Sequence, residues 1–277
     1  MTGSLYQNCD SLDSERLRER LPQSLFTQAV HYVPVLGSTN AWAKELAKRG
    51  EAEGSLVITE KQTAGRGRMG RQWHSPFGVN ILFSVLFRPP FTIDRVFSIT
   101  MLSAASLVDA IRETTGLTAL IKWPNDIYCN GKKMAGILTE FSAGTKSVEY
   151  VVVGIGINAN WEPGAIQELR GLATSLMSEM GQPACREVVL STILERLEKN
   201  YRLLLRGEDA VIRDRWNRHS MVVGKEVMID PEGARIRAKA IGIDRNGALL
   251  IEEEGRTSSV VCGDVQVLFP SLRTSPD

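Results

Sequence analysis

Residues 62–73 read Gln-Thr-Ala-Gly-Arg-Gly-Arg-Met-Gly-Arg-Gln-Trp, a glycine- and arginine-rich stretch that common nucleotide-binding motifs do not explain. Its glycines satisfy the dinucleotide-binding pattern GxGxxG, but that motif needs a helix to begin here, and residues 79–87 read as a strand instead. A P-loop would need Lys and then Ser or Thr where Arg71 and Gln72 stand. The lysine, HRD and DFG motifs of protein kinases do not follow either.

What remains is a flexible backbone that carries Arg66, Arg68 and Arg71 within six residues. Guanidinium groups bind phosphate bidentately and keep their charge, so the stretch suits a phosphate or acyl-phosphate ligand. An arginine-rich nucleic-acid-binding segment and a solvated surface turn are the other interpretations. We interpret residues 62–73 as a loop that clamps a ligand, and we call it the arginine loop.

The composition is that of an ordinary globular protein. The chain has 277 residues, of which 43% are hydrophobic and 23% charged, and its formal net charge is +1. Anion binding must therefore come from a local cluster rather than from the overall field. The cysteines lack the CxxC or Cys/His spacing of a zinc site, so we expect no metal ligands from the protein. With no apolar signal segment and no run of ~18 apolar residues, we expect a cytoplasmic protein without a membrane partner.

The apolar pattern predicts a mixture of helices and strands as far as residue 205. We expect helices at residues 14–20, 41–48, 97–115, 174–179 and 185–205. Strands are expected at residues 31–35, 55–59, 79–87, 119–121, 126–129, 134–141 and 150–157. Asn130-Gly131 predicts a type I′ hairpin turn. The last strand is apolar throughout, as expected of a buried central strand.

After Trp216 the pattern changes to short strands separated by turns. They are expected at residues 226–229, 235–243, 248–252, 257–261 and 265–269, with turns such as 230–233 between them. This spacing predicts a small β-barrel and a boundary near residues 217–223. We therefore predict an N-terminal extension (1–30), a catalytic domain (31–218) and a C-terminal β domain (219–271).

Three further polar clusters lie near predicted strand ends. Residues 122–126 read Lys-Trp-Pro-Asn-Asp; we expect Trp123 in the core, and Asp126 could cap a turn. Residues 132–138 start with two lysines, and strand alternation points one of them inward. Residues 154–158 read Gly-Ile-Gly-Ile-Asn, in which the glycines either allow a ligand close to the backbone or mark a bulge.

Taken together and in this order, the clusters resemble the motifs of the biotin protein ligases. The matching elements are the arginine loop and residues 37–40, 75–80, 122–126, 132–138 and 154–158. The resemblance extends over about residues 31–269. It implies an α/β (α+β) fold: a class II aminoacyl-tRNA-synthetase-like, biotin-ligase catalytic domain with a mixed sheet, followed by a small SH3-like β-barrel.

The resemblance also implies a two-step, ATP-dependent reaction. Biotin attacks the α-phosphate of ATP, with Mg²⁺ as cofactor, to give biotinyl-5′-AMP and pyrophosphate. A lysine of a biotin carboxyl carrier domain, in acetyl-CoA carboxylase or another carboxylase, then takes the biotinyl group. The expected partners are therefore biotin, ATP and that carrier domain, and the chain could be a monomer or a homodimer.

Residue roles follow from the same resemblance. Lys133 and Arg68 are expected to be catalytic, and Trp73 to stack on adenine. Biotin is expected to contact Ser38, Thr39, Asn40, Gln62, Arg66, Gly67, Arg68, Lys133 and Gly136. The nucleotide is expected to contact Arg66, Arg68, Trp73, Asn125, Asn158 and Lys122.

The chemistry of these residues agrees with the resemblance. A ureido ring offers two N–H donors and one carbonyl, which hydroxyl and amide side chains can match. Bringing a carboxylate against a polyphosphate requires cations, which Lys133 and the loop arginines supply. The adenylate is a mixed anhydride, and a loop that orders over it would exclude water.

Two alternative functions are a lipoate or octanoate ligase or transferase of related fold and a non-catalytic nucleic-acid-binding module. The apolar tail of lipoate would leave a polar pocket unused, which favours biotin. Some family members carry an N-terminal helix-turn-helix and repress genes. Only about 35 residues precede the first matching motif here, so we expect no repressor activity and no DNA partner.

Overall fold

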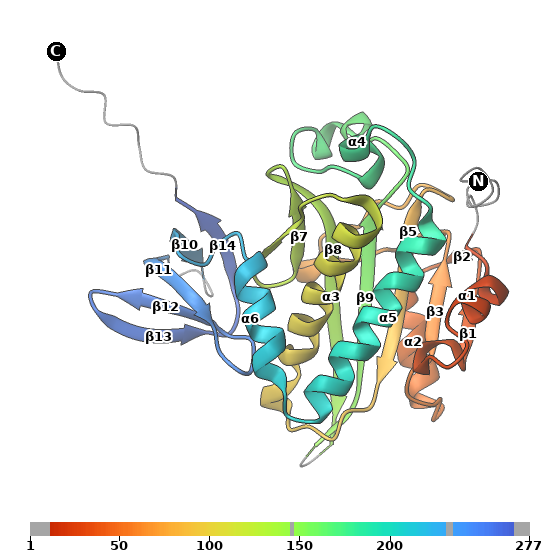
Figure 1. Ribbon diagram of the computed structural model, residues 1–277, viewed down its shortest axis with the longest axis horizontal. Coiled ribbons are helices and arrows are strands. Elements are labelled where there is room, and N and C mark those ends of the chain that lie inside the picture. Colours follow the sequence, from red (N-terminus) through yellow and green to blue (C-terminus); the bar gives the residue numbers. More distant parts are fainter. Residues whose placement is uncertain (1–11, 145–146, 231–234, 269–277) are drawn as a thin grey trace.

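The computed structural model describes residues 12–144, 147–230 and 235–268, and its largest element is a seven-stranded mixed sheet (Figure 1). Only β1 and β3 are parallel, whereas the other neighbouring strands are antiparallel. The strand order is β1 (Val30–Tyr32), β3 (Leu56–Thr59), β5 (Asn80–Phe87), β9 (Val148–Asn158), β8 (Lys132–Ala143), β7 (Asp126–Cys129) and β6 (Leu120–Lys122). A separate two-stranded sheet joins β2 (Val35–Leu36) to β4 (Lys61–Gln62).

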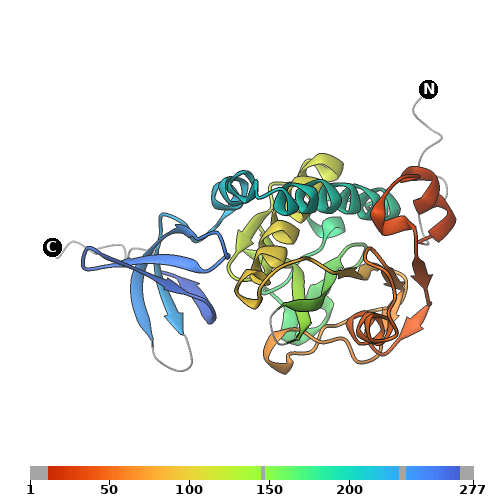
Figure 2. The same cartoon turned by 90° about the horizontal axis from the view of Figure 1, so that it is seen from below.

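Helices cover both faces of the large sheet. On one face lie α3 (Phe97–Thr115) and α5 (Arg186–Leu205), and α2 (Thr39–Lys48) packs on the opposite face (Figures 1 and 2). The remaining helices are α1 (Ser14–Arg20), α4 (Leu176–Met180) and α6 (Asp209–His219). Short 3₁₀ turns are η1 (Leu25–Thr27), η2 (Arg68–Gly70), η3 (Ile93–Arg95), η4 (Pro163–Ala165) and η5 (Gln167–Leu169).

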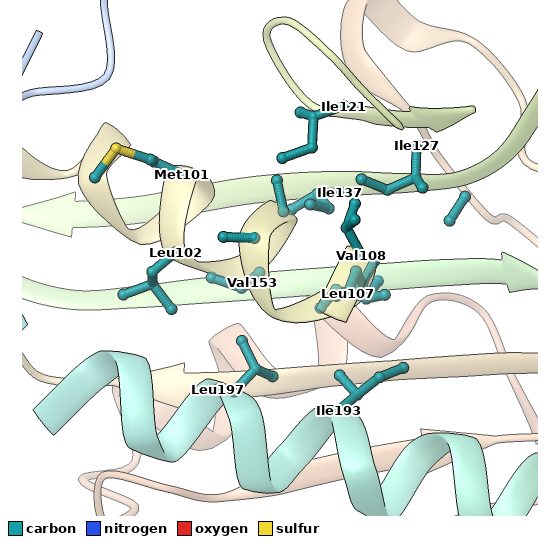
Figure 3. Packing of buried hydrophobic residues seen from close by; sticks show 14 of the residues in the cluster. Met101, Leu102, Leu107, Val108, Ile121, Ile127, Ile137, Val153, Ile193 and Leu197 are labelled. Carbon is teal, nitrogen blue, oxygen red and sulfur yellow. The ribbon is translucent and has the colours of Figure 1, made fainter. Parts of the chain in front are cut away.

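The alternation of side chains along β9 separates the core from the functional face. Val151, Val153 and Ile155 join the main core with residues of α3 and α5. Figure 3 shows Val153 in this core with labelled residues of both helices. Tyr150 and Val152 point to the other face and join a smaller cluster with residues of α2. Because successive strand residues alternate between faces, positions 154, 156 and 158 continue this second face. It is there that the polar site described below is built.

Most of the expected elements are present. Helix 97–115 and strand 126–129 have the predicted bounds, and Asn130 and Gly131 both have the positive φ of a type I′ turn. The expected strand 31–35 is interrupted before β2. Helix α6 was not predicted, because it is so polar that only Ile212 and Trp216 are buried.

The C-terminal part forms a five-stranded antiparallel sheet, in agreement with the five predicted strands. Its order is β13 (Arg256–Val260), β12 (Leu249–Glu253), β11 (Ile236–Ile243), β10 (Glu226–Asp230) and β14 (Asp264–Val267). In the described part of this sheet, β13 and β14 are its two edges. The predicted turn 230–233 falls largely outside the described residues, and the domain boundaries stay predictions.

Trp123 joins the two sheets. It is buried, as expected of a core residue, and its ring meets Phe97 edge to face. Its Nε1 donates to the carbonyl of Gly247, 3.1 Å away in the C-terminal part. This contact places the C-terminal sheet against the end of the β6–β7 hairpin. No helix of the described residues is both long and apolar enough to span a membrane.

A buried ion pair anchors the turn between β3 and β4. Arg186, at the start of α5, donates from Nη1 to Glu60 Oε2 over 2.6 Å and to the carbonyl of Asn80 over 2.9 Å. The backbone N–H of Leu12 donates to the other Glu60 oxygen. Both charged side chains are almost fully buried, so each depends on the other to offset the loss of hydration.

Replacing one partner of this pair should destabilise the protein strongly. We expect Arg186→Met to lower the free energy of unfolding by about 3–5 kcal/mol, because Glu60 would be buried without its cation. Urea unfolding followed by circular dichroism measures this. Arg196→Met, which removes a more exposed pair with Glu113, is the matched control and should cost less than about 1 kcal/mol. Equal losses in the two variants would contradict the role of the buried pair.

Candidate active site

A cavity of about 380 Å³ lies on the α2 side of the large sheet, beneath the arginine loop. Strands β8 and β9 contribute to its lining, as does β14 of the C-terminal sheet. Every residue that the sequence analysis assigned to the site lines this cavity: Ser38, Thr39, Asn40, Gln62, Arg66, Gly67, Arg68, Trp73, Lys122, Asn125, Lys133, Gly136 and Asn158. Their placement together agrees with the prediction, whereas their individual roles stay predictions.

The arginine loop folds back on itself as a small hairpin. The backbone N–H of Gly67 donates to the carbonyl of Arg71 over 2.7 Å, and that of Trp73 donates to Gly65 over 3.0 Å. Met69 at the tip has a φ of 55° and a largely exposed side chain. The hairpin thus presents its arginines to the cavity while its tip points into solvent.

An uncharged polar cluster surrounds the N-terminus of α2. Ser38 caps the helix, and its hydroxyl accepts from the backbone N–H of Ala41. The backbone N–H and the hydroxyl of Thr39 both lie within hydrogen-bond distance of Gln62 Oε1, at 2.9 and 3.2 Å. These bonds tie α2 to β4, so hydroxyl and amide groups converge at one end of the arginine loop.

Among the charged side chains of the lining, cations outnumber carboxylates. Five Lys or Arg side chains face only two carboxylates: Arg66, Arg68, Arg71, Lys122 and Lys133 against Asp126 and Asp264. Such a cluster raises the local concentration of anions although the net charge of the chain is only +1.

Several of these charges are already held in place by protein partners. Lys133 Nζ lies 2.7 Å from Asp126 Oδ1. Arg68 donates to Asn125 Oδ1 over 3.2 Å. Of the two lysines after the hairpin turn, Lys132 is exposed and Lys133 faces the cavity, as strand alternation predicted.

An ion pair connects the arginine loop to the C-terminal sheet. Arg71 Nη2 lies 2.5 Å from Asp264 Oδ2 of β14. Burial raises the pKa of the Asp264 carboxyl, but the hydrogen bond and charge of Arg71 outweigh it and hold this pKa below its usual value. The pair keeps the loop beside β14, and sequence reasoning did not find it because the two residues are 193 positions apart.

Trp73 lies on a floor made of glycine. A Cβ atom added at Gly156 would come within 2.6 Å of the indole ring, and one added at Gly136 within 3.3 Å. Lys133 Nζ is 5.8 Å from the ring centroid. The indole Nε1 is buried and has no hydrogen-bond partner among the described residues. The glycines of residues 154–158 therefore make room for side chains of the protein itself.

Two family models match the chain. The Biotin/lipoate A/B protein ligase family matches residues 32–158, and the Biotin protein ligase C terminal domain matches residues 222–268. The chain is 37% identical over 257 residues to the bifunctional ligase/repressor BirA of Bacillus subtilis, which covers 92% of this chain and 79% of that protein. The chain belongs to the biotin protein ligase family.

Two further biotin protein ligases are also similar to this chain. The biotin–acetyl-CoA-carboxylase ligase of Mycobacterium tuberculosis is 30% identical over 261 residues, which covers 92% of this chain and 95% of that one. The biotin protein ligase of Aquifex aeolicus, solved in complex with biotin and ATP, superimposes with a TM-score of 0.75 at 26% identity. That match covers 87% of this chain and 99% of the other. The predicted family, fold and enzyme class are confirmed.

The glycine floor can be tested directly. Gly156→Ala should push Trp73 off the sheet, because the new Cβ would lie 2.6 Å from the indole ring. We expect an altered near-ultraviolet circular dichroism spectrum and at least a tenfold loss of ATP-dependent activity. A tenfold loss corresponds to a free-energy difference of about 1.4 kcal/mol. Gly144→Ala, whose Cβ would meet only ordinary contacts at 3.5 Å or more, should change neither. Full activity in Gly156→Ala would contradict the importance of the floor.

Proposed function

We propose that the chain activates biotin with MgATP to form biotinyl-5′-AMP and then transfers the biotinyl group to a lysine of a carrier domain. One observation carries the proposal: a single cavity brings an uncharged hydroxyl and amide cluster together with five cations. A ureido ring matches the first and a carboxylate next to a triphosphate matches the second. Relatives named as biotin ligases support the same substrates.

In the first step, the cations would offset the repulsion between the biotin carboxylate and the phosphates. Lys133 is placed to do so, because its ammonium faces the cavity and is held by Asp126 at 2.7 Å. Arg68 would stabilise the charge that develops at the α-phosphate. The carboxylate oxygen then bonds to phosphorus, and pyrophosphate leaves with the electron pair of the broken P–O bond.

Mg²⁺ would accompany ATP as part of the substrate. This ion usually keeps several waters and binds through phosphates and one or two carboxylates. Asp126 and Asp264 offer oxygen atoms in the cavity lining, which fits this mode. The described residues contain no group of three or more Asp, Glu, His or Cys that could hold a metal ion by itself.

The arginine loop would retain the intermediate. Because water hydrolyses an acyl adenylate, the loop must cover it until the carrier lysine arrives. The Arg71–Asp264 pair supports this role, since it holds the loop beside β14. In the second step, the uncharged lysine amine of a carrier domain attacks the acyl carbon, and AMP leaves.

Pyrophosphate release tests the first step. Wild-type protein should release pyrophosphate from MgATP when biotin is present, and lipoate should not replace biotin. Lys133→Ala should lower this rate by at least 100-fold, the size expected for one preorganised charge contact. Lys132→Ala, which removes the exposed neighbour, should retain the wild-type rate. Release driven by lipoate alone, or an unaffected Lys133→Ala, would contradict the assignment.

We also propose that this chain acts without repressor function. The support is its near-neutral charge, because specific DNA binders usually carry a basic surface. DNA binding should be tested directly, because some relatives are named bifunctional ligase/repressor. A gel shift with operator-type and random duplex DNA should show no complex at 150 mM salt, with or without biotin and MgATP. A biotin-dependent, sequence-specific shift would overturn this part of the proposal.

A further inference from the structure

Ser84 lies beneath the polar end of the cavity without lining it. It is fully buried on β5, opposite Gly154 of β9. Its hydroxyl lies 2.8 Å from Thr39 Oγ1 and 2.7 Å from Asn40 Oδ1. Both are ordinary hydrogen-bond distances between two oxygen atoms. The single hydroxyl of Ser84 is thus shared between two side chains that were predicted to bind biotin.

Asn40 has already used its hydrogen-bond donors within the protein. Its Nδ2 donates to the carbonyl of Leu138 over 3.1 Å and to Glu140 Oε2 over 2.9 Å. An amide nitrogen has two hydrogens, so both are committed. The Oδ1 atom therefore points at Ser84 and can only accept. Asn40 is only 4% exposed, so little of its side chain is accessible to a ligand.

Glu140, which accepts a hydrogen bond from Asn40 Nδ2, is itself held in place by a second partner. Glu140 receives Lys44 Nζ on its other oxygen at 2.5 Å. Burial raises the pKa of Glu140, but the hydrogen bonds from Lys44 and Asn40 outweigh it and lower this pKa below the usual value. The carboxylate thus stays an acceptor around neutral pH. The Asn40 side chain fits here because residue 154 is glycine: a Cβ atom at that position would lie 1.9 Å from Asn40 Oδ1.

The hydrogens available in this network determine what Thr39 can offer a ligand. Ser84 has one hydroxyl hydrogen for two acceptors, Thr39 Oγ1 and Asn40 Oδ1. When Ser84 donates to Asn40 Oδ1, which carries no hydrogen, the 2.8 Å contact with Thr39 is a hydrogen bond only if Thr39 donates to Ser84. When Ser84 donates to Thr39, the Thr39 hydroxyl donates to Gln62 Oε1, 3.2 Å away. In both arrangements the Thr39 hydrogen is used inside the protein. Thr39 Oγ1 therefore presents only lone pairs to the cavity.

We propose that Ser84 is a positioning residue that makes the Thr39 hydroxyl an obligate acceptor and so selects a ligand with a ring N–H. Asn40 belongs to the same relay and acts through Ser84. The inference rests on the proposed function, which supplies a ureido N–H as the matching donor. A site that leaves a buried acceptor unpaired rejects the wrong ligand strongly.

The test compares biotin with its cyclic carbamate analogue, in which a ring oxygen replaces one N–H. Kinetics of pyrophosphate release give kcat/KM for each compound, and wild type should prefer biotin. In Ser84→Ala, Thr39 loses one of its two partners and can turn its hydrogen toward the ring oxygen. We expect the preference to fall about tenfold and the KM for biotin to rise while the KM for ATP stays constant.

Two controls separate positioning from a general loss of structure. Ser103→Ala removes a fully buried hydroxyl that donates only to Ile99 within α3, and it should leave the preference unchanged. In a Thr39→Val background, Ser84→Ala should change the preference no further, because Ser84 acts through Thr39. Ser84→Cys, of similar size and with a weak donor, provides a second variant should the alanine protein not fold.

The outcomes are distinct. A wild-type protein that releases no pyrophosphate with biotin would overturn the proposed function and this inference together. Biotin-dependent release with an unchanged preference in Ser84→Ala and Ser84→Cys would overturn the inference alone. The same fall in Ser103→Ala, or a further fall in the Thr39→Val background, would also overturn it.

Discussion

Asn40 and Trp73 can occupy their places only because β9 carries no side chains at Gly154 and Gly156. A Cβ at either position would lie 1.9 Å from Asn40 Oδ1 or 2.6 Å from the Trp73 indole. The rest of the strand is closely packed on its other face by Val151, Val153 and their neighbours. The same strand thus supplies a rigid core on one side and an open floor on the other. Sites built on such rigid elements hold their groups more precisely than sites on loops alone.

The charges of the protein are balanced over the whole chain but concentrated at the cavity. Nearly equal numbers of acidic and basic residues give the whole chain no strong field. The arginine loop, the β6–β7 hairpin and β8 bring five cations to one cavity, which creates a local field where a polyanion would bind. Asp126 pairs with Lys133 and Asp264 pairs with Arg71, so two of these cations are held in place by the protein itself. The site is therefore preorganised, and its charges need little rearrangement when the substrate arrives.

Much of this arrangement could be predicted from the sequence, because motifs mark it and local chemistry explains it. The arginine loop and the inward lysine of the β7–β8 hairpin depend on neighbouring residues, which a linear pattern records. Every predicted site residue lines the cavity. The role of Gly154 and Gly156 could not be predicted, because only the packing of α2 and the arginine loop against β9 shows which side chains lie over these glycines.

Other parts depend on contacts between distant segments and could not be predicted. Ser84 is one polar residue in an apolar strand, and nothing near it in sequence indicates that it lies under α2. Arg71 and Asp264 meet only because the C-terminal sheet packs against the loop. Helix α6 lacks an apolar stripe, and Ile212 and Trp216, four residues apart, were its one signal.

The most direct test of the account is whether the cavity retains an acyl adenylate. The protein is incubated with biotin and MgATP, passed rapidly through a desalting column and denatured, and the released small molecules are identified by mass spectrometry. Biotinyl-5′-AMP is expected in an amount close to that of the protein, and it should be consumed when a biotin carboxyl carrier domain is added before denaturation. Recovery of only free biotin and ATP, with no adenylate under any of these conditions, would contradict this expectation.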